Sequence, residues 1–524
     1  MPKCKFESRT ELNAKVLRGV NTLADNVAAT LGPKGRNVIL QEKGKGPFIT
    51  KDGVTVSAFI HCDDEFENAG AQILKQATAQ TNAMAGDGTT TATVLARAII
   101  SESQRYITAG ASPIELKRGI DVAVERVVDY LKGTATPINT LEQVENIATI
   151  SANNDASIGK LIATAVDQAG KDGSITIEES KTIDTSLDLI EGFRLEAGYA
   201  ASAFITDERR SAVSHDSPLL LVTDSRIDTV DQILGALEVV ARDGRPLIIV
   251  AEEIEGQALA ALIMNTVRGT LKIAAVKAPF YGERRRSLLA DLALSTGAEF
   301  LSRDSTVALK DVKLSHFGQC RSVDITKNGT TIVGGRGDFG EIDKRIELLK
   351  KELAATDDLR ECEKIQERIT KLGSGVAVIR VGAPTEVEMI EKKHRIEDAL
   401  EAVKSAQEEG IVCGGGVALF QAKASLGEVT TENADQQLGV EIVFKSLSSP
   451  LRQMAVNSGL SPDLIAAQIE ESPKNCGYNF RDFSVVNLIE TGIIDPVKVT
   501  RVALQNAASA AGTLITTSHA IVEI

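Results

Sequence analysis

A short run of acidic, glycine and threonine residues has the composition of a phosphate-binding loop. The sequence AGDGTTT at residues 85–91 directly precedes the apolar run 92–100, which is typical of a helix. A helix N-terminus offers unpaired N–H groups and partial positive charge, so it binds anions well. Two glycines allow close backbone approach, the threonines add hydroxyl donors, and Asp87 is suited to the Mg²⁺ that accompanies a triphosphate. An Asp-Gly turn followed by a threonine N-cap explains the same residues without a ligand.

Four other segments have the composition that a nucleotide pocket needs. Residues 30–37 (TLGPKGRN) form a glycine-rich turn, and residues 51–55 (KDGVT) place a cation and a carboxylate on a tight turn. Residues 413–416 (CGGG) precede an apolar helix start, where glycine permits close approach of the backbone to a ligand. Asn479 and Asp495 are candidate base and ribose contacts. Each segment alone is ordinary turn chemistry, so only their joint presence favours a nucleotide site.

A glycine pattern at residues 335–340 (GRGDFG) suggests a different chemistry, because it fits the dinucleotide-binding pattern G-x-G-x-x-G. A dinucleotide fold requires a second strand with an acidic end after the short helix that follows. Instead, a charged helical stretch runs on to residue 371. The pattern is therefore a weak indication of a dinucleotide enzyme. The Walker A sequence is absent from the chain, so any NTPase activity is not of the P-loop kind.

Composition limits the compartment and the partners. The 524 residues suffice for about three domains, and 43% hydrophobic with 25% charged residues provides a sizeable core. A net charge of −14 argues against nucleic acid as the main partner. No apolar run reaches the length of a membrane span, and the first residues lack an apolar signal core. Six scattered cysteines without CxxC spacing make zinc or a disulfide framework improbable. We expect a cytoplasmic protein without a membrane partner.

The composition of the chain and the periodicity of its apolar residues change twice along the sequence. Both ends are rich in alanine and helical in pattern, whereas residues from about 192 to 375 alternate β-rich runs with helices. Similar ends around a different middle suggest a discontinuous domain from which an outer α/β domain projects. The expected helices are 11–31, 67–85, 92–109, 113–132, 231–242, 257–268, 341–371 (broken) and 385–406, and the expected strands are 37–41, 54–60, 219–222, 246–250, 271–276, 330–333, 376–381 and 514–524.

Two helices of the middle region carry apolar stripes. Ile233, Leu234, Leu237 and Val240 share one face of residues 231–242, and residues 257–268 repeat the pattern with Leu259, Leu262, Ile263 and Met264. The simplest interpretation is that both stripes face their own core. If they are partly uncovered, they form an apolar groove for varied partner segments, a use to which a flexible thioether side chain is suited.

Together and in this order, the segments resemble the group I chaperonins, the GroEL family. The resemblance rests on TLGPKGRNV, KDGVTV, GDGTTTATVLA, EVEMIEKKHRIEDAL, GGGVAL, GYN and GIIDPVKVTR and extends from Ala14 to Glu523. It implies a multidomain α and α/β ring subunit. The mainly helical equatorial domain would comprise residues 1–133 and 409–524, the small intermediate hinge domain residues 134–190 and 376–408, and the α/β apical domain residues 191–375.

The resemblance also implies an ATPase that needs Mg²⁺ and K⁺. It places nucleotide contacts at Thr30, Leu31, Gly32 and Pro33, phosphate and Mg²⁺ binding at Asp87, Gly88, Thr89, Thr90 and Thr91, K⁺ binding at Thr30, Lys51 and Thr90, and nucleoside contacts at Gly415, Asn479 and Asp495, with Phe480 and Arg481 beside them. Asp52 and Asp398 would orient and activate the attacking water. Asp398 lies on the charged helix 385–406, which would deliver it when the intermediate domain closes.

The apical stripes acquire a function by the same resemblance. Non-native polypeptides, and the mobile loop of any co-chaperonin, would bind at Tyr199, Phe204, Leu234, Leu237, Leu259, Ile263 and Met264. The subunits would form a homo-oligomeric ring of about seven members by analogy. ATP-driven motion would bury this apolar rim and release the captive chain into a closed chamber.

The chain departs from the family mainly at positions that connect subunits. Ala197 and Ala83 stand where partners of Glu386 and Lys327 are expected, and Ala434 and Ser461 replace acids that pair across rings with Arg105 and Arg452. We therefore expect looser ring–ring association and weaker cooperativity, although each exposed pair contributes only about 0–1 kcal/mol. Ala203 replaces a rim aromatic. Phe480 and Arg481 replace small residues, so that they either tighten the adenine contact or crowd it. The Gly-Met tail of the family is missing.

Two rival functions stay open beside the chaperonin ATPase. The first is a specialised protein-binding ring or scaffold with weak ATP cycling, against which Asp52, Asp87 and Asp398 argue. The second is the dinucleotide enzyme that residues 335–340 suggest. The sequence leaves open which client proteins are bound, whether a co-chaperonin is needed, and whether rings pair.

Overall fold

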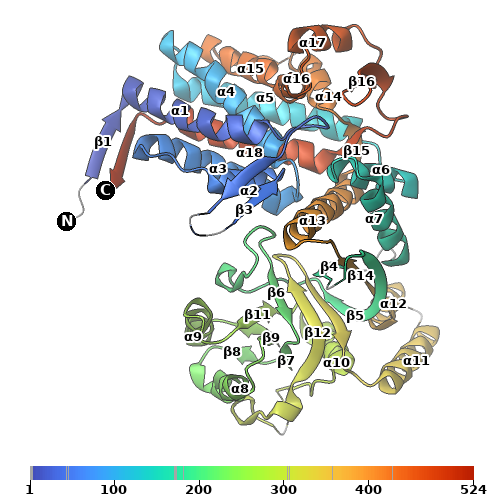
Figure 1. The fold of residues 1–524 in the computed structure, drawn as a ribbon. Helices are drawn as coiled ribbons and strands as arrows, with labels where there is room; N and C mark the ends of the chain where they lie inside the picture. The colour runs from blue at the N-terminus through green and yellow to red at the C-terminus, as the bar shows by residue number, and fades with distance from the viewer. Residues whose placement is uncertain are drawn as a thin grey trace. The chain divides into compact units, whose positions relative to one another are not determined.

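The computed structural model divides into two compact units, which we call the helical unit and the sheet unit. The helical unit comprises Met1–Ala163 and Ala383–Ile524, and the sheet unit comprises Thr164–Gly382. Figure 1 shows the course of the chain. This architecture confirms the predicted combination of α and α/β parts. The structure describes residues 4–523 apart from 43, 45, 170–173, 181, 304, 306, 357, 374 and 428.

Long helices rich in alanine and branched aliphatic residues form the core of the helical unit. Helix α18 is buried along most of its length, because small residues let neighbouring helices approach it closely. Glycines bring α1 and α3 together, since a Cβ on Gly19 would stand 1.8 Å from the carbonyl oxygen of Glu67. The principal helices are α1 (Arg9–Ala28), α3 (Glu65–Ala85), α4 (Thr89–Thr108), α5 (Pro113–Thr134), α15 (Ala434–Ser446) and α18 (Val497–Ile515).

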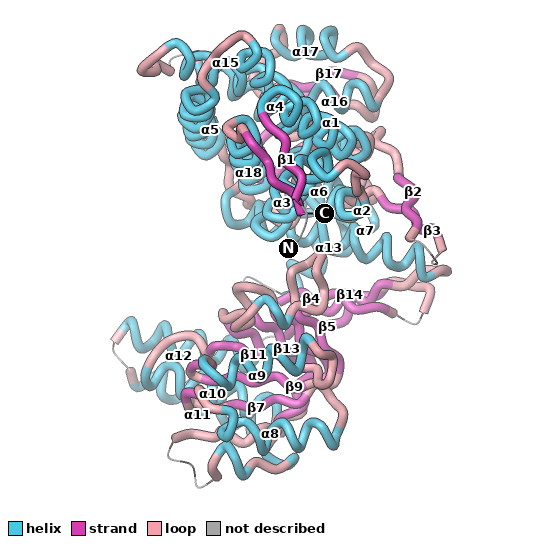
Figure 2. The backbone as a smooth tube through the Cα atoms, turned by 90° about the vertical axis from the view of Figure 1, so that its left-hand side faces the viewer, coloured by secondary structure: helices cyan, strands magenta, loops and turns pink. Residues whose placement is uncertain are grey.

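Short strands complete this unit. Near the ends of the chain, β1 (Cys4–Ser8) pairs antiparallel with β19 (His519–Glu523), so both described ends meet in one ribbon (Figures 1 and 2). The other pairs are antiparallel as well: β2 (Val38–Gln41) with β3 (Pro47–Thr50), β15 (Ile411–Cys413) with β18 (Ile494–Pro496), and β16 (Cys476–Asn479) with β17 (Ser484–Asn487).

Two sequence expectations are wrong in this unit. The expected strand 54–60 is a helix, α2 (Gly53–Phe59), although its β-branched residues favour a strand. The side chain of Asp52 caps this helix by accepting the N–H groups of Val54 and Thr55, and Val56 is buried, so tertiary packing overrides local preference. The expected strand 514–524 begins only at His519, because α18 continues to Ile515.

The remaining helices of this unit surround the short strands. Helix α6 (Leu141–Ser151) packs against the long charged helix α13 (Glu386–Glu409). Helices α14 (Val417–Ala422), α16 (Ser449–Asn457) and α17 (Pro462–Glu470) pack around β16 in a second apolar cluster. Helix α7 (Ala156–Ala169) crosses the boundary to the sheet unit.

A mixed sheet forms the middle of the sheet unit, and its strand order is β11-β9-β7-β12-β13-β5-β14-β4. The parallel strands β7 (Leu219–Val222), β9 (Leu247–Ala251) and β11 (Ile273–Lys277) are nearly continuous apolar runs, as expected of strands covered on both faces. Strands are concentrated in this unit (Figure 2). The others are β12 (Gly318–Ile325), β13 (Thr330–Gly335), β5 (Ser186–Leu195), β14 (Gly375–Val381), β4 (Ser174–Glu179), and β6 (Val213–Asp216), which pairs with β12; the helices are α8 (Val230–Asp243), α9 (Gly256–Val267), α10 (Gly282–Thr296), α11 (Phe339–Ala355) and α12 (Leu359–Gly373).

The segments expected to form an intermediate domain are divided between the two units. Helices α6 and α13 belong to the helical unit, whereas β4 and β14 pair in parallel within the sheet unit. The division into three domains, with boundaries near residues 133, 190, 375 and 408, stays a prediction.

The glycine pattern at 335–340 has a packing explanation. A Cβ on Gly337 would stand 2.0 Å from the carbonyl oxygen of Leu294, so glycine lets this loop pack on the end of α10. Asp338 caps α11, and α12 follows α11 instead of a strand. The elements after the pattern are therefore not those of a dinucleotide fold.

Candidate functional site

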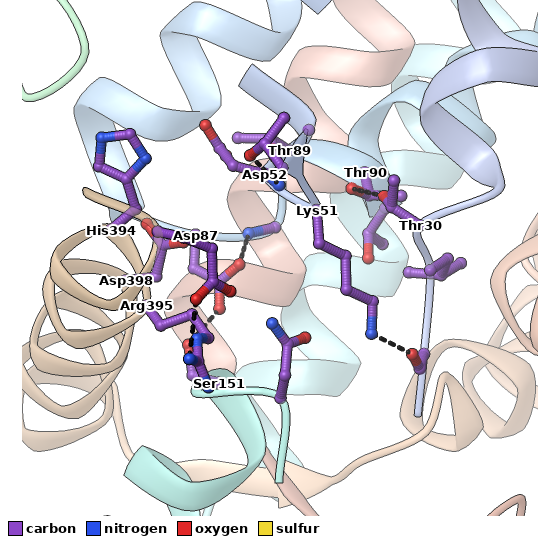
Figure 3. Close-up of a pocket in the computed structure, with 18 residues that line it drawn as sticks. Thr30, Lys51, Asp52, Asp87, Thr89, Thr90, Ser151, His394, Arg395 and Asp398 are labelled. Carbon is purple, nitrogen blue, oxygen red and sulfur yellow. Dashed lines mark hydrogen bonds and ion pairs between the residues drawn. The ribbon is translucent and has the colours of Figure 1, made fainter. Parts of the chain in front are cut away.

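Three of the glycine-containing segments, at residues 30–32, 50–53 and 87–91, converge on one cavity of about 130 Å³ in the helical unit. Figure 3 shows the cavity, with Asp87, Ser151 and Asp398 on one side and Thr30, Thr90 and Lys51 on the other. Its lining is polar and comes from five separate segments of the chain. The lining residues are Thr30, Leu31, Gly32, Thr50, Lys51, Asp52, Gly53, Asp87, Gly88, Thr89, Thr90, Thr91, Ser151, Asn153, Glu391, His394, Arg395 and Asp398.

Two left-handed glycines shape the loop between α3 and α4. Gly86 ends α3 with a φ of 71°, and Gly88 precedes α4 with a φ of 84°, a region that side chains rarely adopt. A Cβ on Gly86 would stand 2.1 Å from the Cβ of Glu401, and one on Gly88 would stand 2.7 Å from a methyl of Val499. Both glycines are therefore required, and the N-terminus of α4 opens into the cavity through Thr89, Thr90 and Thr91.

The carboxylate of Asp87 is held in the centre of this loop. One oxygen accepts the backbone N–H of Gly88, and the other accepts the hydroxyl of Ser151 at 2.8 Å. Ser151 ends α6, more than sixty residues away along the chain. The sequence analysis missed Ser151, because a serine at a helix end carries no signal of its own for a ligand.

Asp52 is fixed by its role as a helix cap. Its two oxygens accept the N–H groups of Val54 at 3.2 Å and Thr55 at 3.0 Å, and the Thr55 hydroxyl donates to it as well. A Cβ on Gly53 would stand 2.6 Å from the hydroxyl oxygen of Thr90. The start of α2 therefore lies directly against the start of α4, which places the carboxylate of Asp52 at the cavity.

Thr30, Thr90 and Lys51 form the opposite wall. The hydroxyl oxygens of the two threonines are 3.4 Å apart, and Thr30 also donates to the carbonyl of Val27. The ammonium of Lys51 donates to the carbonyl of Gly32 at 3.1 Å. Burial lowers the pKa of Lys51 and the charge of Arg395 lowers it further, while Glu391 opposes both.

Helix α13 supplies the last wall. Glu391, His394, Arg395 and Asp398 line the cavity at spacings of three and four residues, which is one face of a helix. Arg395 pairs with Glu391 at 2.8 Å and with Asp155 at 3.1 Å. The sequence analysis identified Asp398 alone, although the same helical spacing pointed to its three neighbours.

Six predicted nucleotide contacts lie outside the lining of the cavity: Pro33, Gly415, Asn479, Phe480, Arg481 and Asp495. Gly415 has a φ of 63° and open space where a Cβ would stand. Asp495 on β18 lies beside Gly414, whose Cβ would be 3.1 Å from its carboxylate. Burial raises the pKa of Asp495 to about 7, and the charge of Asp87 adds to the effect. Asp495 is thus electrostatically connected to the cavity.

The hairpin between β16 and β17 differs from expectation. Phe480 is buried against Tyr478, with ring centroids 5.2 Å apart, so its ring is a core element and is not placed to stack on a base. The amide of Asn479 is used within the turn, where its oxygen accepts the N–H of Arg481 at 2.9 Å and its nitrogen donates to Asp482 at 2.8 Å. Arg481 is exposed.

The apolar residues expected at a rim fall into two groups in the sheet unit. Leu234 on α8 and Met264 on α9 are 47% and 48% exposed, and Tyr199, Leu259 and Ile263 are half-buried. Two expected rim residues do not fit, because Phe204 is completely buried in the core and Leu237 is only 9% exposed. Ile233, Val240 and Leu262 also face the core, as the simpler interpretation of the stripes predicts. Val267 on α9, 69% exposed, was missed.

The donor set of the cavity fits a hard divalent cation shared with phosphates. Asp52, Asp87, Glu391 and Asp398 supply carboxylates, and Lys51 and Arg395 are the basic residues of the lining. Mg²⁺ uses one or two carboxylates and completes its shell with water and substrate phosphates. Among the described residues, no group of three or more His, Cys, Asp or Glu side chains is placed to hold a metal alone.

None of the helices in the described ranges combines the length and apolar character that a membrane crossing needs.

Comparison with known proteins agrees with this fold. The model of the TCP-1/cpn60 chaperonin family matches residues 23–524. The structure is similar to two crystal forms of the chaperonin gp146 from the bacteriophage EL 2 (Pseudomonas aeruginosa), both in the presence of ATP-BeFx. Form II has a TM-score of 0.65 at 20% identity and form I a TM-score of 0.62 at 21% identity, and each comparison covers 99% of both chains.

Proposed function

Because the chain belongs to the TCP-1/cpn60 chaperonin family, we propose that it is a chaperonin subunit that hydrolyses ATP and folds non-native polypeptides inside a ring. The observation that carries the proposal is the convergence of Asp52, Asp87 and Asp398 on one cavity from three distant segments. Each carboxylate is placed by a separate local device: a helix cap, a glycine loop and a helix face. Such convergence is unexpected of ordinary turn chemistry.

ATP is the proposed substrate. The N–H groups at the start of α4 and the hydroxyls of Thr89, Thr90 and Thr91 would bind its phosphates. Thr30, Leu31, Gly32 and Pro33 would contact the phosphate chain and sugar. Gly415 and Asp495 would contact the nucleoside, since the open space at Gly415 leaves room for a ligand. The internal bonds of Asn479 argue for a smaller contribution from that residue.

Two cations would accompany the nucleotide. Asp87 would hold Mg²⁺, which neutralises charge on the phosphates and so supplies electrostatic stabilisation. K⁺ prefers neutral oxygen ligands, which the hydroxyls of Thr30 and Thr90 offer from 3.4 Å apart. Lys51 would contribute its backbone carbonyl, because its ammonium cannot ligate a cation.

Asp398 and Asp52 would orient the attacking water for in-line displacement of the γ-phosphoryl group. Phosphoryl transfer depends mainly on positioning and charge neutralisation, so a correctly placed carboxylate contributes by aligning the water and accepting its hydrogen bond. Asp398 reaches the cavity only while α13 lies against it. Hydrolysis would therefore be coupled to movement of α13 within the subunit.

Client capture would use the exposed apolar side chains of α8 and α9. Leu234, Met264 and Val267 are about half exposed or more, and Tyr199, Leu259 and Ile263 border them. Apolar contact is non-directional, so such a surface accepts many sequences. We leave Phe204 and Leu237 out of this surface, because their side chains are buried.

We propose a homo-oligomeric ring of about seven subunits in the cytoplasm, with a co-chaperonin as a further partner to be tested. Arg105 pairs internally with Glu102 at 3.0 Å and Arg452 with Asp463 at 2.6 Å. Because these cations are already engaged within the chain, we propose weak ring–ring association.

Steady-state ATP turnover by the wild type and Asp398→Ala tests the proposal. We expect the variant to bind ATP and lose about a hundredfold or more in turnover, the scale of a general base, and to stop refolding a denatured client. Glu408→Gln is the matched control, since Glu408 is an exposed acid on the same helix, paired with Lys498. A wild type that captures clients but turns over no ATP would overturn the ATPase and favour a binding scaffold.

A further inference from the structure

His394 is a titratable residue of the cavity without a role in the proposed hydrolysis. It lines the cavity from α13, four residues before Asp398 (Figure 3). Side chains at this spacing are neighbours on one helix face, about one turn apart. His394 is partly buried, so part of the residue is accessible to solvent.

The groups around this imidazole define its electrostatic setting. The charged residues of the lining come from three places. Lys51 and Asp52 stand before α2, Asp87 stands between α3 and α4, and Glu391, Arg395 and Asp398 lie on α13 itself. Near the end of α6 the lining residues are the uncharged Ser151 and Asn153. Acidic groups thus outnumber basic ones, which suits a group that receives a proton.

Arg395 pairs with Glu391 and Asp155, and its guanidinium offers donors but no acceptor for a proton. Imidazole changes charge between about pH 5 and 8. Asp495, whose pKa is raised to about 7, is a second group that titrates in this range, although it lies outside the cavity lining. The experiment must therefore separate His394 from Asp495.

We infer that His394 is a positioning residue that accepts the proton of the hydrolytic water from Asp398 and passes it to solvent. The inference rests on the proposed ATPase. In the step, the water oxygen forms a bond to the γ-phosphorus while the bond from that phosphorus to the β–γ bridging oxygen breaks, with ADP as the leaving group. One water proton moves to Asp398, then to the neutral ring nitrogen of His394, and the other ring nitrogen releases a proton to solvent. The net products are ADP, phosphate and one proton.

The direction of the pH effect follows from this step. A neutral imidazole accepts the proton, whereas an imidazolium cannot, so the relay predicts that turnover falls toward acidic pH. His394→Gln keeps polar contacts but does not titrate near neutrality. We expect this variant to lower kcat about three- to tenfold at pH 8, less than loss of the base itself, and to flatten the profile between pH 6 and 8. KM for ATP stays unchanged.

The experiment compares kcat and KM for phosphate release between pH 5.5 and 9 in the wild type, His394→Gln and His394→Ala. Added imidazole should restore kcat in the alanine variant, which leaves space for it, and not in the glutamine variant. His61→Gln is the matched control, since His61 is an exposed histidine before α3. Asp495→Asn runs in parallel, because loss of the acidic limb there would assign it to Asp495.

The outcomes are separable from those of the proposed function. A wild type without ATP turnover overturns both proposals. An active wild type with a His394→Gln profile that matches it overturns the relay alone, and so does an acidic limb that persists in His394→Gln and vanishes in Asp495→Asn. A flattened profile in His394→Gln together with imidazole rescue of His394→Ala supports the relay.

Discussion

The cavity of the helical unit and the apolar face of the sheet unit, by which we mean the exposed apolar side chains of α8 and α9, are built in opposite ways. The cavity collects polar groups from five separate segments, and several of these groups are fixed by a hydrogen bond, a helix cap or a glycine whose Cβ would clash with a neighbour. The apolar face comes from two helices close in sequence, and it consists of the side chains that core packing leaves exposed. The first arrangement selects one ligand geometry, and the second accepts many partners.

This difference predicts how each region tolerates change. In the cavity, Asp87 has one correct position, which Gly88 and Ser151 define, so a single functional group decides activity. On the apolar face, binding energy scales with buried area and is shared among several side chains, so single changes have graded effects. The predictions below test this contrast, beginning with the largest expected effect.

Asp87→Asn should abolish most ATP turnover while the fold is kept. The asparagine oxygen can still accept the N–H of Gly88, and its amide can donate to the oxygen of Ser151, so the loop geometry survives. The negative charge that would hold Mg²⁺ is lost, and we expect turnover to fall about a hundredfold or more, as when a main electrostatic group is removed. Phosphate release at saturating ATP and Mg²⁺ measures the effect.

Asp121→Asn provides the control for this variant. Asp121 is an exposed aspartate on α5, paired with Lys117 at 2.7 Å, and it lies outside the cavity. It should turn over ATP at the wild-type rate. If Asp87→Asn retained more than about a tenth of the wild-type activity, the cavity would tolerate loss of its central charge, and its contrast with the apolar face would not hold.

The sequence predicted the cavity better than it predicted the elements around it. Glycine, aspartate and threonine clusters carry chemistry in their composition, so the segments at 30–32, 51–52 and 87–91, which line the cavity, were expected from the residues themselves, whereas Asp398 was expected only from the family resemblance. Ser151 was missed, because a lone serine at a helix end carries no signal for a ligand, whereas His394 and Arg395 were missed although their helical spacing places them on the same face as Asp398. The strand expected at 54–60 was wrong, since the cap at Asp52 and burial of Val56 decide for a helix.

On the apolar face, the sequence identified the helices but not which side chains are exposed. Periodicity places Leu234 and Leu237 on one stripe, yet the first is 47% exposed and the second 9%. A shift of less than one turn separates core from surface, and neighbouring elements fix that shift. Phe204 shows the limit clearly, because its burial follows from packing of the segment before β6 against α9.

The double variant Leu234→Ser and Met264→Ser should weaken client capture without changing ATP turnover. Each side chain is about half exposed, so burial of its apolar surface against a client contributes roughly 1 kcal/mol or more to the binding free energy. We expect the apparent affinity for a denatured client to fall about tenfold or somewhat more, since 1.4 kcal/mol corresponds to a factor of ten. Competition binding with a labelled, reduced and unfolded protein measures this loss.

Leu348→Ser is the matched control in the same unit, because Leu348 on α11 is 57% exposed and belongs to a different surface. It should bind the client like the wild type. If it lowered affinity as much as the double variant, general surface hydrophobicity would explain capture, and α8 and α9 would lose their special role.

Asn479→Ala gives the smallest expected effect and sharpens the boundary of the cavity. The side chain already makes two bonds within the hairpin, to Arg481 and Asp482, so little of its hydrogen-bonding capacity is left for a base. We expect KM for ATP to change less than about threefold and stability to fall by about 0.5–1.5 kcal/mol, the worth of a net hydrogen bond.

Asp482→Ala removes one of the same bonds and serves as the comparison, because it disturbs the turn without removing the amide. If both variants lose similar stability and keep their KM for ATP, Asn479 is a turn residue, and the nucleotide contacts extend to Asp495 but not to this hairpin. A tenfold rise in KM for Asn479→Ala alone would instead show that the amide leaves the turn to contact the nucleotide, and would extend the selective region to this hairpin.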